Sequence, residues 1–188
     1  QYGDRLQPVR SPVLPLVYHP EYSFPFPGKH RFPMEKFARL HGHLRSRGIA
    51  HGDNEFRPGR AKATLLSQAH CPQYVSAMVD GTLDARALRR MGLPWSEALM
   101  KRSCIAPMGT LMAAQLALQQ GIACHLAGGT HHAHYDFGSG FCIFNDQAFA
   151  VRQLLDRGVV KKVLMFDFDV HHVYGTSAMM ADEPRSFT

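Results

Sequence analysis

The sequence has no long apolar run, no signal peptide and few cysteines. Its apolar segments are far shorter than the roughly 20 residues that cross a bilayer, so we expect no membrane partner. The start, QYGDRLQPVR, lacks an apolar signal core and does not indicate secretion. Scattered thiols without a CxxC pair favour a reducing compartment over a disulfide framework, and they are Cys71, Cys104, Cys124 and Cys142. We therefore expect a cytoplasmic protein.

Acidic residues are also scarce. Asp and Glu number 15 against 21 Lys and Arg, which gives a net charge of +6. This bias is a weak indication of an anionic partner. Because no motif that combines aromatic and basic residues accompanies it, a nucleic-acid partner is not expected. A basic nucleic-acid-binding module remains a rival hypothesis, which strongly salt-dependent binding would support.

The composition is that of an ordinary globular protein. Hydrophobic residues make up 45% of 188, enough for one domain with a substantial core. We predict a single domain over residues 1–188 that begins with an irregular segment at 1–13. The chain starts without Met and ends in RSFT, which resembles the start of another strand. We therefore expect this domain to be incomplete, and the sequence leaves the oligomeric state open.

Hydrophobic patterns and turn residues predict an alternation of short strands and helices. Strands are expected at 16–18, 122–126 and 163–166, and a polar loop at 49–62. Helices are expected at about 33–48, within 63–81, at 96–121 and at 144–157. Leu40 and Leu118 are placed on inward helix faces, and Pro107 is expected to kink or break its helix.

The stretch VLMFDFDVHH at 163–172 carries the densest chemistry. Its apolar start predicts a buried parallel strand, at whose C-terminal end open α/β sheets place their sites. If the backbone stays extended, Asp167, Asp169 and His171 point to one side. A carboxylate there needs a metal, a hydrogen-bond partner or water.

A second polar loop, GGTHHAHYDFGSGFCIFND, follows the strand at 122–126. With the next helix and strand it forms a predicted β-α-β unit with a right-handed crossover and parallel strands. Both loops then open at the same edge of the sheet. His131 and His132 can therefore meet Asp167, Asp169 and His171 in space.

These residue types suit hydrolysis with a metal ion. Adjacent imidazoles can act as a base and its electrostatic partner, and Asp167 can fix the tautomer of one of them. Asp169 and His171 offer an oxygen and a nitrogen donor, which suit Zn²⁺ or another borderline divalent ion such as Fe²⁺. Glycines 138 and 140 allow the backbone to approach a substrate, and Phe141 can line an apolar slot.

Simpler interpretations exist for each feature alone. A chain with twelve histidines often carries an HH pair on its surface. An Asp after a strand is more often a cap or turn residue. A Gly-rich loop before a helix can bind phosphate, although GGTHHAH lacks the Lys and spacing of a P-loop. The coincidence of HH and DxDxH after two strands of one unit favours a catalytic site.

The motifs LPLVYHPEY, GKHRFPMEKF, AGGTHHA…GFCIFND and DFDVHH resemble the zinc-dependent histone deacetylase family. The likeness is to bacterial and class IV-type members, which include acetoin utilisation proteins, and it runs from about Leu14 to the last residue. The resemblance implies the three-layer α/β/α arginase-deacetylase fold with a mainly parallel sheet, truncated at its C-terminal side.

The resemblance also implies roles for single residues. Asp169 and His171 would be metal ligands, His132 the general base, and His131 its electrostatic partner oriented by Asp167. It further implies that Gly140 and Phe141 line a tunnel for an acylated amine, with a K⁺ ion near Asp167 and His171. The expected substrate is acetylated lysine or a small acetylated amine.

Two departures from the family pattern stand out. Val173 and Tyr174 occupy positions where the family has Gly and then Asp or Asn. Tyr174 would replace the group that orients His132, so the base is expected to be mistuned. The family's third metal ligand and its oxyanion-stabilising Tyr would lie beyond Thr188. The alternative to a metal-dependent deacetylase is thus a truncated, inactive homologue that binds metal or a partner, and another arginase-like metallohydrolase is a further rival.

Overall fold

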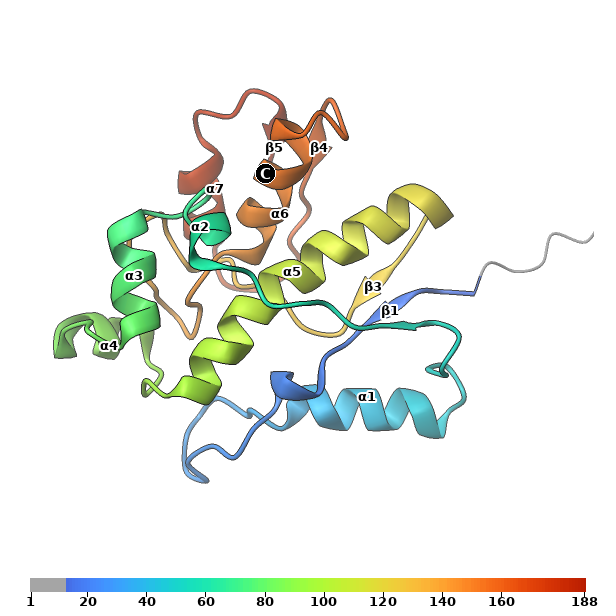
Figure 1. Cartoon of the computed structure of the whole chain (residues 1–188), viewed down its shortest axis with the longest axis horizontal. Helices are drawn as coiled ribbons and strands as arrows, with labels where there is room; N and C mark the ends of the chain where they lie inside the picture. The colour runs from blue at the N-terminus through green and yellow to red at the C-terminus, as the bar shows by residue number, and fades with distance from the viewer. Residues whose placement is uncertain (1–12) are drawn as a thin grey trace, which may run out of the picture.

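The structure is a computed structural model that describes residues 13–188, so the segment expected at 1–13 falls almost entirely outside it. Figure 1 follows the chain from its blue N-terminal end to its red C-terminal end. The helices and strands are β1 (Leu16–Val17), the 3-10 helix η1 (Pro20–Tyr22), α1 (Lys36–Ser46), β2 (Glu55–Phe56), α2 (Ala63–Leu66), α3 (Pro72–Asp80), α4 (Ala85–Met91), α5 (Glu97–Gln120), β3 (Cys124–His125), α6 (Asp146–Asp156), β4 (Val163–Leu164), α7 (Tyr174–Met180) and β5 (Ser186–Phe187).

The first sheet has three parallel strands in the order β2-β1-β3. In its register, Leu16 of β1 lies opposite Glu55 of β2 and Cys124 of β3. The strand predicted at 16–18 is confirmed, and the one predicted at 122–126 is present in shorter form. A parallel arrangement requires long connections between strands, and α1 and α5 lie within these connections.

Both faces of this sheet are covered by helices. Successive residues of a strand point to opposite faces, and both residues of β1 are buried. Leu16 packs in a cluster with Ala50, just after α1, whereas Val17 packs against Ala113 and Leu116 of α5. The result is the predicted α/β/α layering with a mainly parallel sheet.

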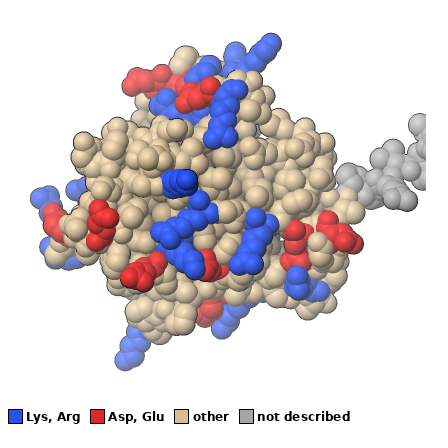
Figure 2. All heavy atoms as spheres, viewed as in Figure 1, with Lys and Arg blue, Asp and Glu red and all other residues tan. Residues whose placement is uncertain are grey.

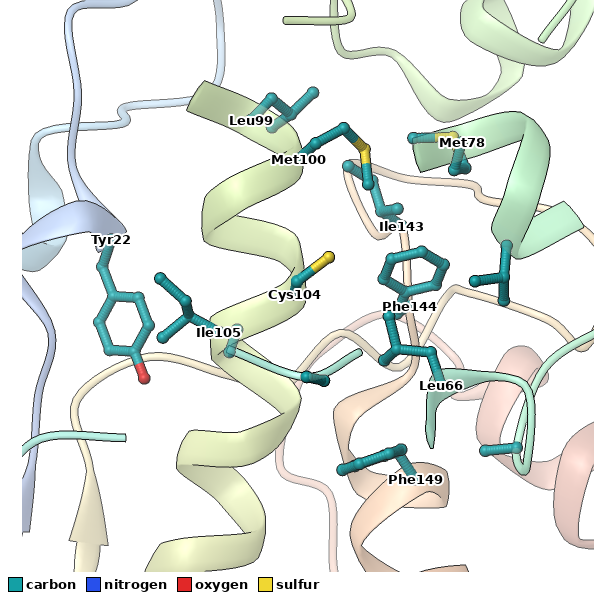
Figure 3. Packing of buried hydrophobic residues seen from close by; sticks show 14 of the residues in the cluster. Tyr22, Leu66, Met78, Leu99, Met100, Cys104, Ile105, Ile143, Phe144 and Phe149 are labelled. Carbon is teal, nitrogen blue, oxygen red and sulfur yellow. The ribbon is translucent and has the colours of Figure 1, made fainter. Parts of the chain in front are cut away.

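Helix α5 forms the centre of the hydrophobic core. Figure 3 shows it between Tyr22 on one side and Ile143, Phe144 and Leu66 on the other, all in one buried cluster. Burying one such side chain contributes about 1.5–3 kcal/mol. Because α5 is buried on both sides, it positions the segments that flank it, including the loop before α6.

Pro107 does not break α5, which continues from Glu97 to Gln120. The expected break is therefore wrong, and packing on both sides of the helix explains why. Proline removes one backbone donor from the helical ladder. Close to it, the carbonyl of Cys104 accepts a hydrogen bond from the N–H of Ala61 at 2.9 Å. The segment between β2 and α2, which crosses α5 in Figure 1, is anchored in this way.

The strand at 163–166 is not buried as expected. β4 comprises only Val163–Leu164 and pairs with β5 in a separate two-stranded parallel sheet. Leu164 is 60% exposed and Phe166 is 74% exposed. Among residues 13–188, β3 and β4 belong to different sheets, so the prediction of one β-α-β unit within one sheet is also wrong. An apolar strand is buried only where other elements cover it, and here that cover is missing.

Three smaller predictions also failed. Residues 49–62 contain β2 and are not purely a loop, and α4 was not predicted. Leu40 and Leu118 are exposed although their spacing placed them inward. Leu118 lies in the last turn of α5, where a helix can extend past its neighbours, whereas Leu40 lies in the middle of α1 and nothing in the structure explains its exposure.

Surface features agree with the composition. No helix in the described residues is long and apolar enough to span a bilayer. All four cysteines, which lie within residues 13–188, are unpaired. On the face in Figure 2, small groups of basic and acidic side chains are separated by wide uncharged areas.

Candidate active site

The loop between β3 and α6 is fixed at its start by a buried carboxylate. Asp146, the first residue of α6, accepts hydrogen bonds from the backbone N–H groups of Gly129 (3.2 Å) and Thr130 (2.7 Å). Gly128 has a φ of +96°, and a Cβ there would lie 2.6 Å from Asp146 Oδ2. The loop can therefore approach the helix N-terminus only with glycine at this position. The next residues are His131 and His132.

The two histidines and Asp167 form a hydrogen-bonded chain. Asp167 Oδ2 lies 2.8 Å from His131 Nδ1, and His131 Nε2 lies 3.1 Å from His132 Nε2. The two rings are nearly perpendicular, with centroids 4.2 Å apart. An ionised carboxylate can only accept, so His131 Nδ1 carries the proton in this arrangement. The predicted meeting of the two loops has thus occurred, although their strands do not pair.

His132 is placed to take up a proton. Burial lowers the pKa of His132, and the neighbouring imidazoles of His131 and His171 lower it further. A lowered pKa keeps the imidazole neutral near pH 7, as a general base requires.

Gly140 supports the ring of His132. It has a φ of +52°, and a Cβ there would lie 2.6 Å from His132 Cδ2. The backbone at 140 is therefore in direct contact with the imidazole, and any larger residue would displace it. Gly140, which is predicted to line a substrate tunnel, lines the cavity described below and also packs against the predicted base.

Phe141 has a strained backbone, with a φ of +66° that bulky residues rarely adopt. Its N–H donates to the carbonyl of Met91 at 2.8 Å, which holds this conformation. Its ring lies near those of His30 and Phe32, at 5.8 and 5.6 Å between centroids. Strain of this kind persists only where the surroundings enforce it, and here it directs an aromatic ring at the site.

A cavity of about 430 Å³ joins most of the predicted site residues. Those that line it are His131, His132, Gly140, Phe141, Asp169 and His171. Asp167 lies behind His131 and does not line this cavity. Tyr174 is 64% exposed and stacks on His172, with 4.1 Å between ring centroids. Within the described part of the chain, no hydrogen bond joins Tyr174 to His132.

Asp169 and His171 provide two metal donors of suitable type. Asp169 Oδ1 lies 2.9 Å from His171 Nδ1. Hydrogen bonds from the backbone N–H and then the imidazole of His171 lower the pKa of Asp169 and keep it ionised. Two ligands of one zinc ion, each about 2.0–2.2 Å from it, lie roughly 3 Å apart or slightly more, so this pair fits. Residues 13–188 contain no group of three or more possible ligands, so the pair by itself falls short of the three protein ligands usual in a catalytic zinc site.

Two basic residues that the sequence patterns did not predict, Arg102 and Lys36, also line the cavity. Arg102 is 5% exposed and has no carboxylate partner among the described residues. Its Nε donates to the carbonyl of Tyr22 at 3.0 Å, and its guanidinium lies 4.6 Å from the ring centroid of Phe37. Burial lowers the pKa of Arg102 to about 10, so it remains charged at neutral pH. Lys36 lines the same cavity with its ammonium over Phe32 and Phe37.

One sequence signal could have revealed this arginine. Arg102 follows Leu99 by three residues and precedes Ala106 by four, so it shares the inward face of α5. A basic residue at such a position needs a partner or access to a cavity.

Comparison with known proteins shows similarity to histone deacetylases and acetoin utilization proteins. The histone deacetylase domain family matches residues 30–188. An uncharacterized protein of Picosynechococcus sp. is 47% identical over 174 residues, which cover 93% of this chain and 58% of the relative. The acetoin utilization protein AcuC of Bacillus subtilis is 28% identical over 180 residues, covering 90% and 46%. Histone deacetylase 2 of Arabidopsis thaliana is 25% identical over 181 residues, covering 92% and 47%.

Solved structures give the same fold. The crystal structure of an HDAC homolog complexed with SAHA superposes with a TM-score of 0.77 at 23% identity. The superposition covers 93% of this chain and 49% of that one. The chain thus spans about half the length of the curated relatives it matches.

Proposed function

Because the chain belongs to the histone deacetylase family, we propose that it carries the histidine pair and part of the metal site of an N-acetyl amide hydrolase. The expected substrate is acetylated lysine or a small acetylated amine. One observation supports this most: the hydrogen-bonded chain from Asp167 through His131 to His132, which ends at a cavity lined by two metal donors.

In this proposal each residue of the hydrogen-bonded series Asp167, His131 and His132 has a separate role. His132 accepts a proton from the water that adds to the amide carbonyl. His131, held by Asp167, stabilises the positive charge that then develops on the pair. When the C–N bond breaks, the pair returns the proton to the departing nitrogen, which leaves a free amine and acetate.

Asp169 and His171 would hold the metal, Zn²⁺ or Fe²⁺. A divalent cation bound there supplies charge that polarises the amide carbonyl and acidifies water. Gly140 leaves room for the His132 ring, and Phe141 provides an apolar wall for the acylated side chain of the substrate. A K⁺ ion near Asp167 and His171 remains a prediction.

The proposal is tested by metal content and turnover of the purified chain, supplied in turn with Zn²⁺ and Fe²⁺. The substrates are a fluorogenic acetyl-lysine peptide and an acetylated diamine. We expect about one metal per chain, its loss in the Asp169→Ala, His171→Ala double variant, and loss of turnover in His132→Ala. His51→Ala, at an exposed histidine, serves as the control.

Metal binding without turnover would instead support the inactive, metal-binding homologue. The apolar side chains exposed on 166–170 favour a partner for such a protein, because large exposed apolar patches mark interaction sites. Folded protein with neither metal nor turnover would contradict both the enzyme and the metal-binding alternative.

A further inference from the structure

A fully buried histidine outside the cavity makes polar contacts on both sides of its ring. His70 lies between α2 and α3 with 0% of its surface exposed. Its Nδ1 lies 3.0 Å from the carbonyl oxygen of His134 and 3.2 Å from that of Tyr135. Its Nε2 lies 3.0 Å from the backbone nitrogen of Asn145. One imidazole thus connects residues 134 and 135 to the start of α6. These two residues belong to the loop between β3 and α6 that carries His131 and His132, called the HH loop below.

The partners determine the tautomer of His70. A backbone N–H can only donate, so Nε2 must accept from Asn145 and carries no proton. Nδ1 then carries the proton and donates to the two carbonyl groups. The ring must be neutral, because a proton on Nε2 would oppose the N–H of Asn145. Burial lowers the pKa of His70 to about 4, which agrees with this assignment.

The contacts of His70 belong to a set that holds the backbone around His132. The carbonyl of His131 accepts from the N–H of Thr176 (3.1 Å), and that of Ala133 accepts from the side-chain amide of Asn145 (3.0 Å). His70 adds the carbonyl of residue 134 and, through Nε2, the backbone of Asn145 itself. The main chain on both sides of His132 is therefore fixed by groups from separate parts of the fold.

We propose that His70 is a positioning residue for the predicted base, His132, and that it acts through the main chain of the HH loop. The proposal rests on the proposed function only for its kinetic consequence. A histidine that merely filled the core would be replaced by phenylalanine without effect on the loop. The hydrogen bonds on the two sides of the His70 ring instead require a neutral imidazole with its proton on Nδ1.

The first test does not involve activity. A long-range ¹H–¹⁵N correlation spectrum of the full chain at pH 7 reports which ring nitrogen of His70 is protonated. We expect the Nδ1–H tautomer, together with slow hydrogen exchange at the amide of Asn145. A His70 ring that is protonated on Nε2, or charged at pH 7, would overturn the proposal whether or not the chain is an enzyme.

The second test separates the contacts of Nδ1 with the HH loop from the contact of Nε2 with Asn145. Asn at position 70 can place a donor near Nδ1, Gln can place an acceptor near Nε2, and Phe can do neither. We expect His70→Phe to lower kcat on the order of 10- to 100-fold with little change in KM, as misplacement of a catalytic group does. His70→Asn should retain more activity than His70→Gln, because it keeps the contact with the loop.

His51→Gln, at an exposed histidine, is the matched control and should retain wild-type kinetics. Folded His70→Phe protein with wild-type kcat would overturn the proposal. If His70→Phe fails to fold, the kinetics of His70→Asn and His70→Gln and the observed tautomer of His70 test the proposal instead. An inactive wild-type chain would contradict the proposed function, and the tautomer and hydrogen exchange would still test the role of His70.

Discussion

His131 and Asp167 are joined by a 2.8 Å hydrogen bond, although the strands that precede them belong to different sheets. β3 and β4 share no backbone hydrogen bond in residues 13–188, so the contact between these side chains does not depend on strand pairing. Other contacts hold the two segments together, such as the hydrogen bond from the N–H of Thr176 in α7 to the carbonyl of His131. The Asp167–His131 bond is therefore a sensitive reporter of site integrity.

Asp167→Asn should reduce turnover on the order of 10²-fold or more with little loss of stability. An amide at position 167 can donate to Nδ1 and so favour the wrong tautomer of His131. Steady-state kinetics measure the loss, with Asp136→Asn as the control, because Asp136 is exposed and lies in the loop that carries His131. Equal turnover in both variants would contradict a role for Asp167 in the site.

Gly175→Ala should destabilise the fold by about 1–3 kcal/mol, as overpacking does. A Cβ at position 175 would lie 2.4 Å from the carbonyl oxygens of His131 and Ala133, so α7 would have to move away from the loop. Urea denaturation measures the change.

The matched control is Gly42→Ala within α1, where a Cβ meets nothing within 4 Å. Alanine there should stabilise by up to about 1 kcal/mol. If both substitutions had the same effect, tight packing at Gly175 would be refuted.

The stability of the chain should fall as the pH drops from about 6.5 toward 4. Burial lowers the pKa of His70 and His125 to about 4, compared with the ordinary value of 6.5. Above pH 6.5 both rings are neutral in the folded and unfolded states, so they add no pH dependence to the free energy of unfolding. Below it the unfolded chain binds protons that the folded chain excludes until about pH 4, so unfolding is favoured.

Each of these histidines contributes on the order of 1 kcal/mol per pH unit across that window. The free energy of unfolding, measured by urea denaturation at pH 7, 6 and 5, checks this. Replacement of His70 by Asn should make the slope shallower, whereas His51→Gln should leave it unchanged. A stability that stays constant from pH 7 to 5 would show that neither histidine is buried in neutral form.

Tyr174→Asp should raise turnover, because the resemblance to the family implies a carboxylate or amide at this position that orients the second histidine. The exposed Tyr174 ring can be removed without opening the core, and a carboxylate is tolerated in the first turn of a helix. Tyr174→Phe is the control and should change little. A further loss of turnover in Tyr174→Asp would mean that the assignment of this position is wrong.

Sequence patterns were sufficient for the local features and for one long-range contact. The expected helix ranges 63–81, 96–121 and 144–157 end close to the observed caps: Ser96 caps α5, and Gly81 and Gly158 follow α3 and α6 in left-handed conformations. The meeting of His131 with Asp167 was predicted from the rule that parallel strands of one sheet end at one edge, and it occurs although β3 and β4 belong to separate sheets. These predictions depend on short spacings or on topology, which sequence patterns encode.

The features that were missed depend on which distant segments pack together. His70 contacts Asn145 across 75 residues, and Arg102 contacts Tyr22 across 80. No local spacing distinguishes such a histidine from one at the surface, and the inward position of Arg102 on α5 does not reveal its contact with Tyr22. The exposure of Phe166 likewise depends on what covers it, and its own apolar character gives the opposite expectation.

The extended segment at 166–171 has consequences for how this protein is handled in the laboratory. Phe166, Phe168 and Val170 are 74%, 95% and 93% exposed, and each is a sequence neighbour of Asp167 or Asp169. Self-association, which exposed apolar side chains promote, and the candidate chemistry are therefore expected to arise from alternate positions of one stretch. Deleting or shuffling that stretch to gain solubility would remove the site, whereas polar replacements at 166, 168 and 170 alone would reduce self-association and leave the carboxylates in place.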